Sequence, residues 1–249
     1  MLSGTTPGGR APVVSPVRTR PGSRLWFLDF YSSSVGKKAV MAVTGIVILG
    51  YVFAHMAGNL HLYQGADKLN GYGEHLRTIG EPILPHTGFL WILRSVLILA
   101  FVLHIHSAFS LTRINRKARP VKYQGGRDYI AANYAARTMR WTGVIVGLFL
   151  IYHLMDLTWG VGGADFTRGE PYQNLVASFE RTPVAIVYII ANLALGLHIF
   201  HGAWSLFQSL GWNNPRFNPW RKAFAVAFAA VIVAGNVSFP IAVMTGIVD

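Results

Sequence analysis

The sequence predicts an all-α membrane protein with five transmembrane helices in a bundle, its N-terminus cytoplasmic and its C-terminus outside. Three observations predict this fold class: the composition, the number of long apolar runs and the places where positive charge gathers. Apolar residues make up 52% of the 249 residues, charged residues only 13%, and the mean hydropathy is +0.39. A soluble domain carries about 25% charged residues. The composition therefore argues against an ordinary soluble protein.

A transmembrane helix needs about 20 predominantly apolar residues to cross about 30 Å of hydrocarbon. Five runs meet this requirement, and the third is the shortest and takes in Asp156. The fifth contains Asn236 and Pro240, which spanning helices tolerate where neighbours satisfy the freed backbone groups. No internal repeat of the solenoid or inverted-repeat type is visible. We expect the spans at residues 39–60, 89–111, 140–158, 183–207 and 223–247.

Two further segments precede the first span. Residues 1–25 are predicted to form a flexible basic tail, and residues 26–249 the membrane domain. The first 24 residues are rich in Pro, Gly, Ser and Arg and lack the apolar centre of a signal peptide. The W-F-L-D-F-Y segment at 26–31 is typical of an interfacial stretch that lies along the lipid headgroups.

Positive charge lies mostly on one side of this topology. The N-terminal segment, the second loop and the fourth loop share one face and carry seventeen Lys and Arg residues, whereas the opposite face carries four. The remaining one, Arg94, falls within the second span. Because basic loops stay cytoplasmic, this asymmetry sets the orientation and predicts a multi-pass protein of the cell (inner) membrane in contact with lipid. It argues against nucleic-acid binding, since spans separate the basic segments.

The chain contains no cysteine and nine histidines. The absence of thiols excludes disulfides, a thiolate nucleophile and an iron–sulfur cluster built from this chain alone. Any metal chemistry must therefore use imidazole ligands.

Histidines recur at matched depths on the first four spans. With a rise of about 1.5 Å per residue, His55 lies about 24 Å and His153 about 20 Å from the inner face. His104 and His198 each lie about 23 Å from the outer face. The depths therefore pair His55 with His153 near the outer side and His104 with His198 near the inner side.

Two imidazoles at one depth on different helices can supply both axial ligands of a haem. The sequence thus predicts two haem sites, an outer one between His55 and His153 and an inner one between His104 and His198. Small residues near these histidines would give a macrocycle room, namely Gly50, Gly58, Gly143, Gly147, Gly196 and Gly202.

Two spare histidines accompany the inner pair. His106 is two positions from His104, so their side chains point to nearly opposite sides of the helix. His201 is three positions from His198 and shares its face, so either could ligate. The spare imidazole would bond a propionate or a quinone oxygen.

Two charged residues within the spans have candidate supporting roles. Arg94 could neutralise a haem propionate, and Asp156, one turn after His153, could orient that imidazole or receive protons. A haem-free, proton-coupled transporter is the alternative from a different class, because buried titratable groups also mark ion pathways. A single histidine within a span can also simply hydrogen-bond a neighbouring helix.

Five stretches carry a resemblance to a known family. They are S-S-V-G-K-K-A-V-M-A-V-T-G at 33–45, H-M-A-G-N-L at 55–60, L-H-I-H-S-A-F-S-L-T-R at 103–113, H-L-M-D-L-T at 153–158 and A-L-G-L-H-I-F-H-G-A-W-S at 194–205. In this order they resemble the five-helix cytochrome b membrane-anchor subunit of succinate dehydrogenase and fumarate reductase (respiratory complex II), the single-chain type that carries two haems b.

The resemblance implies one haem ligand from each of the first four helices, with helices one and three at the outer haem. It favours His104 over His106 and His198 over His201, although the double H-I-H departs from the family pattern. Some relatives lack haem. In those, imidazoles at these depths would help to bind a cluster whose thiolates come from another chain.

The resemblance further implies a subunit that does not itself oxidise succinate. Flavoprotein and iron–sulfur subunits would dock on the cytoplasmic face, electrons would pass through haem b, and a quinone, with menaquinone the expected one, would be reduced. The resemblance also allows a trimer of the whole complex. A di-haem anchor of another quinone-linked dehydrogenase is the nearest alternative.

Candidate quinone residues gather near both faces. Near the inner face they are Trp26, Ser33, Ser34, Lys38, Arg137 and Trp141. Near the outer face, candidate proton donors are Glu74, His75, Glu81 and His86.

Overall fold

The computed structural model describes residues 25–118 and 130–249, with the side chains of 130–137 left outside the description. Residues 1–24 of the predicted tail therefore lie outside the described residues.

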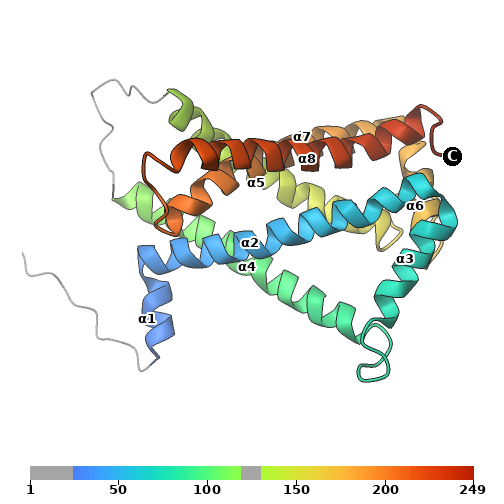
Figure 1. The fold of residues 1–249 in the computed structure, drawn as a ribbon, viewed down its shortest axis with the longest axis horizontal. Helices are drawn as coiled ribbons and strands as arrows, with labels where there is room; N and C mark the ends of the chain where they lie inside the picture. Colours follow the sequence, from blue (N-terminus) through green and yellow to red (C-terminus); the bar gives the residue numbers. More distant parts are fainter. Residues whose placement is uncertain (1–24, 119–129) are drawn as a thin grey trace, which may run out of the picture.

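The described chain is helical and confirms five helices long and apolar enough to cross a membrane. Each of these long helices runs antiparallel to the one before it. The fifth therefore ends at the end of the bundle opposite to α1 (Figure 1). Their bounds are α2 (Ser34–Asn59), α4 (Gly88–Lys117), α5 (Ile130–Leu157), α7 (Thr182–Ser209) and α8 (Asn218–Met244). Each begins one to ten residues before its apolar run, because polar turns at the membrane surface continue the same helix.

Shorter helices close the two ends of the bundle. At one end, the α1 end, the predicted interfacial segment forms α1 (Trp26–Ser32), which stands across the direction of α2 (Figure 1). At the other, the α3 end, lie η1 (Leu60–Gln64), α3 (Ala66–Thr78) and α6 (Pro171–Phe179). Residues 61–88 and 159–182 were expected to form loops between the spans, and the helices there are a finding of the structure.

The sharp turn between α1 and α2 depends on local chemistry. The Ser33 hydroxyl accepts a hydrogen bond from the Gly36 amide at 2.9 Å and so caps the first turn of α2. A Cβ on Gly36 would lie 1.9 Å from the carbonyl oxygen of Phe30, so only glycine allows this approach. The Lys37 ammonium donates to the carbonyls of Tyr31 and Ser32, which are free acceptors at the end of α1.

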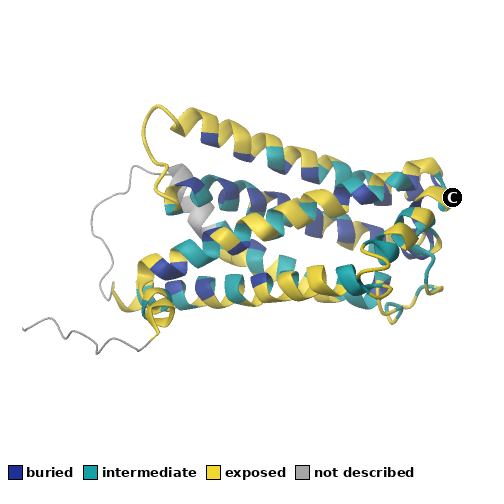
Figure 2. Cartoon of the chain, turned by 60° about the horizontal axis from the view of Figure 1, so that its bottom comes forward, coloured by how far each residue is buried: buried dark blue, intermediate teal, exposed yellow. Residues whose placement is uncertain are grey.

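Much of the outward-facing surface of the helices is exposed (Figure 2), and many of the exposed residues are large and apolar. Ile98, Phe109 and Leu148 are about 60% exposed on α4 and α5. A contiguous apolar surface of this kind suits lipid and not water. The exposed faces therefore agree with a membrane-spanning bundle.

The helices pack in pairs. In the described residues, α2 packs mainly against α4, α5 against α7, and α7 against α8, whereas α2 and α5 make at most slight backbone contact. α7 lies deepest, with Ala185, Tyr188, Ala191, Ile199 and Ala203 buried. Contact between α2 and α5 therefore depends on long side chains, such as those of His55 and His153.

α7 packs closely on α8 where Gly196 faces Val233. A Cβ on Gly196 would lie 2.2 Å from Cγ2 of Val233, a β-branched side chain with few alternative rotamers. We expect Gly196→Ala to destabilise the bundle by about 1–3 kcal/mol, the usual cost of overpacking. Thermal unfolding of the detergent-solubilised protein would measure it. Gly202→Ala on the same helix is the control, since its Cβ would approach only Cε of Met139, at 3.9 Å. Equal stability of the two variants would contradict this prediction.

Candidate cofactor site

Two histidines from helices that barely touch face each other toward the α3 end. The ring centroids of His55 on α2 and His153 on α5 are 5.9 Å apart, with the ring planes at 87°. Tyr51 stacks on His55 at 5.4 Å between centroids. Two metal–imidazole bonds of about 2 Å each, plus the ring radii, place two axial imidazoles at roughly this separation. We call these residues the α3-end pair.

The second pair, His104 on α4 and His198 on α7, lies toward the α1 end, and the two imidazoles are within electrostatic range of each other. The Nδ1 atom of His104 is 3.3 Å from the Thr44 hydroxyl. The Nδ1 atom of His198 is 3.4 Å from the Thr142 hydroxyl. We call His104 and His198 the α1-end pair.

His104 and His198 have matching threonine contacts because α2 and α5 share a short internal repeat, which was not expected from the sequence. The pattern M-x-x-T-G occurs at 41–45 in α2 and at 139–143 in α5, and in both helices a histidine follows the threonine by eleven positions. Eleven residues make three helical turns, so the threonine and the histidine share a face at two levels about 16 Å apart. Each of these helices thus faces both pairs. The repeat runs in the same direction in both halves, unlike the inverted type that was sought.

Glycines provide space at some of the predicted positions and not at others. A Cβ on Gly50 or Gly147 would meet no atom within 4 Å, so both face open space. A Cβ on Gly143 would lie 3.3 Å from Cε1 of His198, so this imidazole rests on the helix backbone. Two expectations fail: Gly58 is covered by the Tyr72 ring and Gly196 by Val233. These two glycines serve helix packing, not a cofactor.

The spare histidines have different surroundings. His106 Nδ1 is hydrogen-bonded to the Tyr31 hydroxyl on α1 at 2.5 Å, so it faces away from the histidine pairs. His201 is buried on α7, and its Nδ1 has no hydrogen-bond partner. Geometry therefore groups His104 with His198 through equivalent threonine contacts and leaves His106 and His201 apart.

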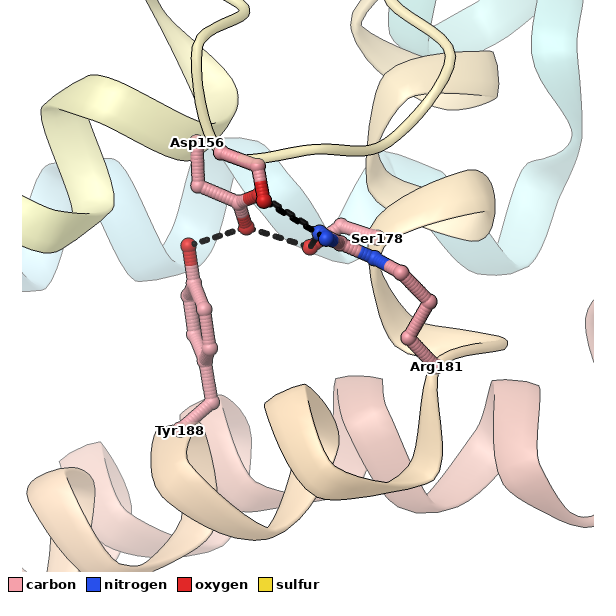
Figure 3. Close-up of polar contacts among 5 residues, drawn as sticks. Asp156, Ser178, Arg181 and Tyr188 are labelled. Atoms are coloured by element: carbon pink, nitrogen blue, oxygen red, sulfur yellow. Dashed lines mark hydrogen bonds and ion pairs between the residues drawn. The ribbon is translucent and has the colours of Figure 1, made fainter.

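Asp156 does not hydrogen-bond His153. Its buried carboxylate accepts hydrogen bonds from the Ser178 hydroxyl, from the Tyr188 hydroxyl at 3.0 Å and from Arg181 Nη2 at 2.7 Å (Figure 3). These donors come from α6, from the residue that precedes α7 and from α7. Asp156 therefore joins three segments at the α3 end, and Tyr188, whose ring centroid is 6.0 Å from that of His153, links it to the pair.

Arg94 lies on the exposed side of α4, with its guanidinium 5.1 Å from the Trp91 ring centroid. It is also within electrostatic range of Tyr51, the residue that stacks on His55. Arg94 is thus placed beside the α3-end pair.

The predicted quinone residues are not brought together. Lys38 lines a cavity of about 370 Å³ at the α1 end with Val35, Ser205, Gln208 and Ser209. Trp26 and Trp141 are 78% and 73% exposed and do not line this cavity. Ser33 caps α2, Ser34 begins α2, and the side chain of Arg137 lies outside the described residues. Ser205, Gln208 and Ser209 were missed because their proximity to Lys38 depends on how α7 packs beside α2.

The four polar residues near the α3 end are largely committed to surface contacts. Glu74 pairs with Arg77 at 2.7 Å, and Glu81 with His86 at 3.1 Å. His75 is exposed on α3.

The donor set fits haem. In the described part of the chain, no three residues among His, Asp and Glu gather as a metal-ion site. Each candidate site therefore offers two imidazoles, which is what haem iron needs from a protein when the macrocycle fills its other four positions. The unpartnered, buried Nδ1 of His153 agrees with a further group bound at this pair.

Fold and site together define a multi-pass helical membrane protein with two histidine pairs at two levels of its bundle. Residues 127–237, which include α5, α7 and most of α8, match the family of the succinate dehydrogenase/fumarate reductase transmembrane subunit. Over this part of its length the chain is similar to the membrane subunit of complex II, and members of that family are subunits of an oxidoreductase complex. No curated protein and no solved structure gave a significant match.

Proposed function

We propose that the chain is the haem-carrying membrane anchor of a succinate:quinone oxidoreductase. The observation that supports this best is the presence of two histidine pairs. One is formed by α2 and α5, and the other by α4 and α7. His55 and His153 would hold one haem b, and His104 and His198 a second. When bound, haem iron would supply one-electron transfer between the two faces of the bundle.

The residues of the chain would bind, orient and neutralise these groups. Arg94 would offer a positive charge for a propionate at the level of the α3-end pair. Tyr51 and Tyr188 shield the imidazoles of this pair by stacking and edge contacts. The low-dielectric surroundings would keep all four imidazoles neutral, which is the form that ligates iron.

The α1 end would face the cytoplasm and receive the flavoprotein and iron–sulfur subunits. The basic loops of this face follow the positive-inside rule and would also attract acidic partners or anionic lipids. The cavity beside Lys38 is the candidate quinone site, because an ammonium and three polar side chains surround a space near the α1-end pair. Menaquinone remains the expected quinone.

A reduced-minus-oxidised absorption spectrum tests this proposal. We expect the purified complex to show a b-type spectrum with two haems per chain. A colourless protein would favour the haem-free transporter or an anchor with another cofactor. If the spectrum is present, the copurifying subunits distinguish succinate dehydrogenase from another quinone-linked dehydrogenase.

A further inference from the structure

The two threonines of the M-x-x-T-G repeat have only acceptor capacity left for the neighbouring histidines. A hydroxyl carries one proton, and both threonines use it within their own helix. Thr44 donates to the Val40 carbonyl at 2.7 Å, and Thr142 donates to the Thr138 carbonyl at 2.9 Å. What each hydroxyl presents to the Nδ1 of the facing imidazole is therefore a lone pair.

This lone pair decides which ring nitrogen carries the proton. The Thr44 hydroxyl lies 3.3 Å from Nδ1 of His104, and the Thr142 hydroxyl lies 3.4 Å from Nδ1 of His198. With an acceptor beside it, Nδ1 carries the imidazole proton, since a neutral ring has one protonated and one bare nitrogen. The bare nitrogen is then Nε2.

We propose that Thr44 and Thr142 are positioning residues that hold the proton of His104 and His198 on Nδ1 and leave both Nε2 atoms free to ligate metal. This inference rests on the proposed haem-binding function and adds to it the groups that fix the ligands. Hydrogen bonds of this kind set the tautomer and ring orientation and raise the basicity of a metal-bound imidazole.

In the part of the chain that the structure describes, no threonine hydroxyl is hydrogen-bonded to either imidazole of the α3-end pair. His153 Nδ1 is buried without a partner, and His55 Nε2 lies 3.4 Å from Asn59 Nδ2, a donor on its own helix. The threonine acceptors therefore distinguish the two sites, and removing them should affect only the haem of the α1-end pair.

Thr44→Val and Thr142→Val remove the acceptor and preserve the branched shape. In the assembled membrane complex, a redox titration followed through the b-type absorbance would give the midpoint potential of each haem. We expect one potential to move upward in each variant, because a less basic imidazole stabilises oxidised iron less. The shifted haem should be the one that His104→Ala removes.

Serine variants and a second threonine provide the controls. Thr44→Ser and Thr142→Ser retain the hydroxyl and should restore the original potential, or restore a haem lost in the valine variants. Thr112→Val removes a hydroxyl that likewise donates within its helix, to the Ala108 carbonyl at 2.8 Å, but is not hydrogen-bonded to an imidazole in the described structure.

Unshifted potentials in both valine variants, a shift of the other haem, or an equal shift in Thr112→Val would overturn the positioning role alone. Two haems with normal potentials in the unmodified complex would still uphold the proposed function in those cases. A complex without b-type absorbance would overturn the proposed function itself, and the positioning role with it.

Discussion

Replacing His55 or His153 by alanine is expected to abolish one of two b-type haem signals and to leave the other unchanged. The two imidazoles face each other across 5.9 Å, so loss of either one would leave the proposed site with one imidazole. The other pair lies on α4 and α7, at another level of the bundle, and would keep both of its imidazoles. The expected effect is large because the two imidazoles are the groups that would ligate the iron.

The measurement is the number of haems per chain in purified complex, together with the reduced-minus-oxidised spectrum. His104→Ala and His198→Ala should remove the opposite signal, so the four variants fall into two spectral classes. His75→Ala is a matched control, because His75 is exposed on α3, outside the five spans. If His55→Ala and His153→Ala removed different haems, the pairing would be wrong.

Much of the fold could be predicted from the sequence because a membrane imposes a simple rule. Spanning helices need long apolar runs, and a fixed rise per residue turns sequence position into depth. This arithmetic placed His55 beside His153, as the structure also does. The helices α3 and α6 were missed because they are amphipathic or short, and their packing at the α3 end, not an apolar run, stabilises them.

The supporting contacts of the site were harder to predict, for two different reasons. The threonine repeat was visible in the sequence, but its meaning depends on which helix packs against which. Thr44 lies beside His104, sixty positions away, because α2 packs against α4. The partners of Asp156 could not be found from local spacing at all: Ser178 and Tyr188 follow a long connection that folds back over the end of α5. Proximity to His153 in sequence therefore suggested the wrong partner for this carboxylate.

Arg181→Gln is expected to be the most destabilising single change at the α3 end. The Asp156 side chain is 0% exposed and that of Arg181 28% exposed, so the carboxylate depends on the guanidinium for its charge balance. Removing one partner of a buried ion pair costs about 3–5 kcal/mol, because the remaining charge stays buried without compensation. Arg181 also donates to the Gly162 carbonyl at 2.6 Å, so its loss frees the loop after α5 as well. Thermal unfolding of the solubilised protein would measure the effect.

The two partners should not be equivalent. Asp156→Asn leaves Arg181 unpaired, but this side chain is partly exposed and can reach water, so we expect a smaller loss of stability than in Arg181→Gln. The loss of unfolding free energy in the double variant should be smaller than the sum of the losses in the two single variants, since no lone charge remains. Glu74→Gln, which breaks the exposed Arg77–Glu74 pair, should change stability by no more than about 1 kcal/mol. If Arg181→Gln proved as mild as Glu74→Gln, the buried carboxylate would not need its guanidinium, and the hydrogen bonds from Ser178 and Tyr188 together with apolar packing would suffice to stabilise the junction of α5, α6 and α7.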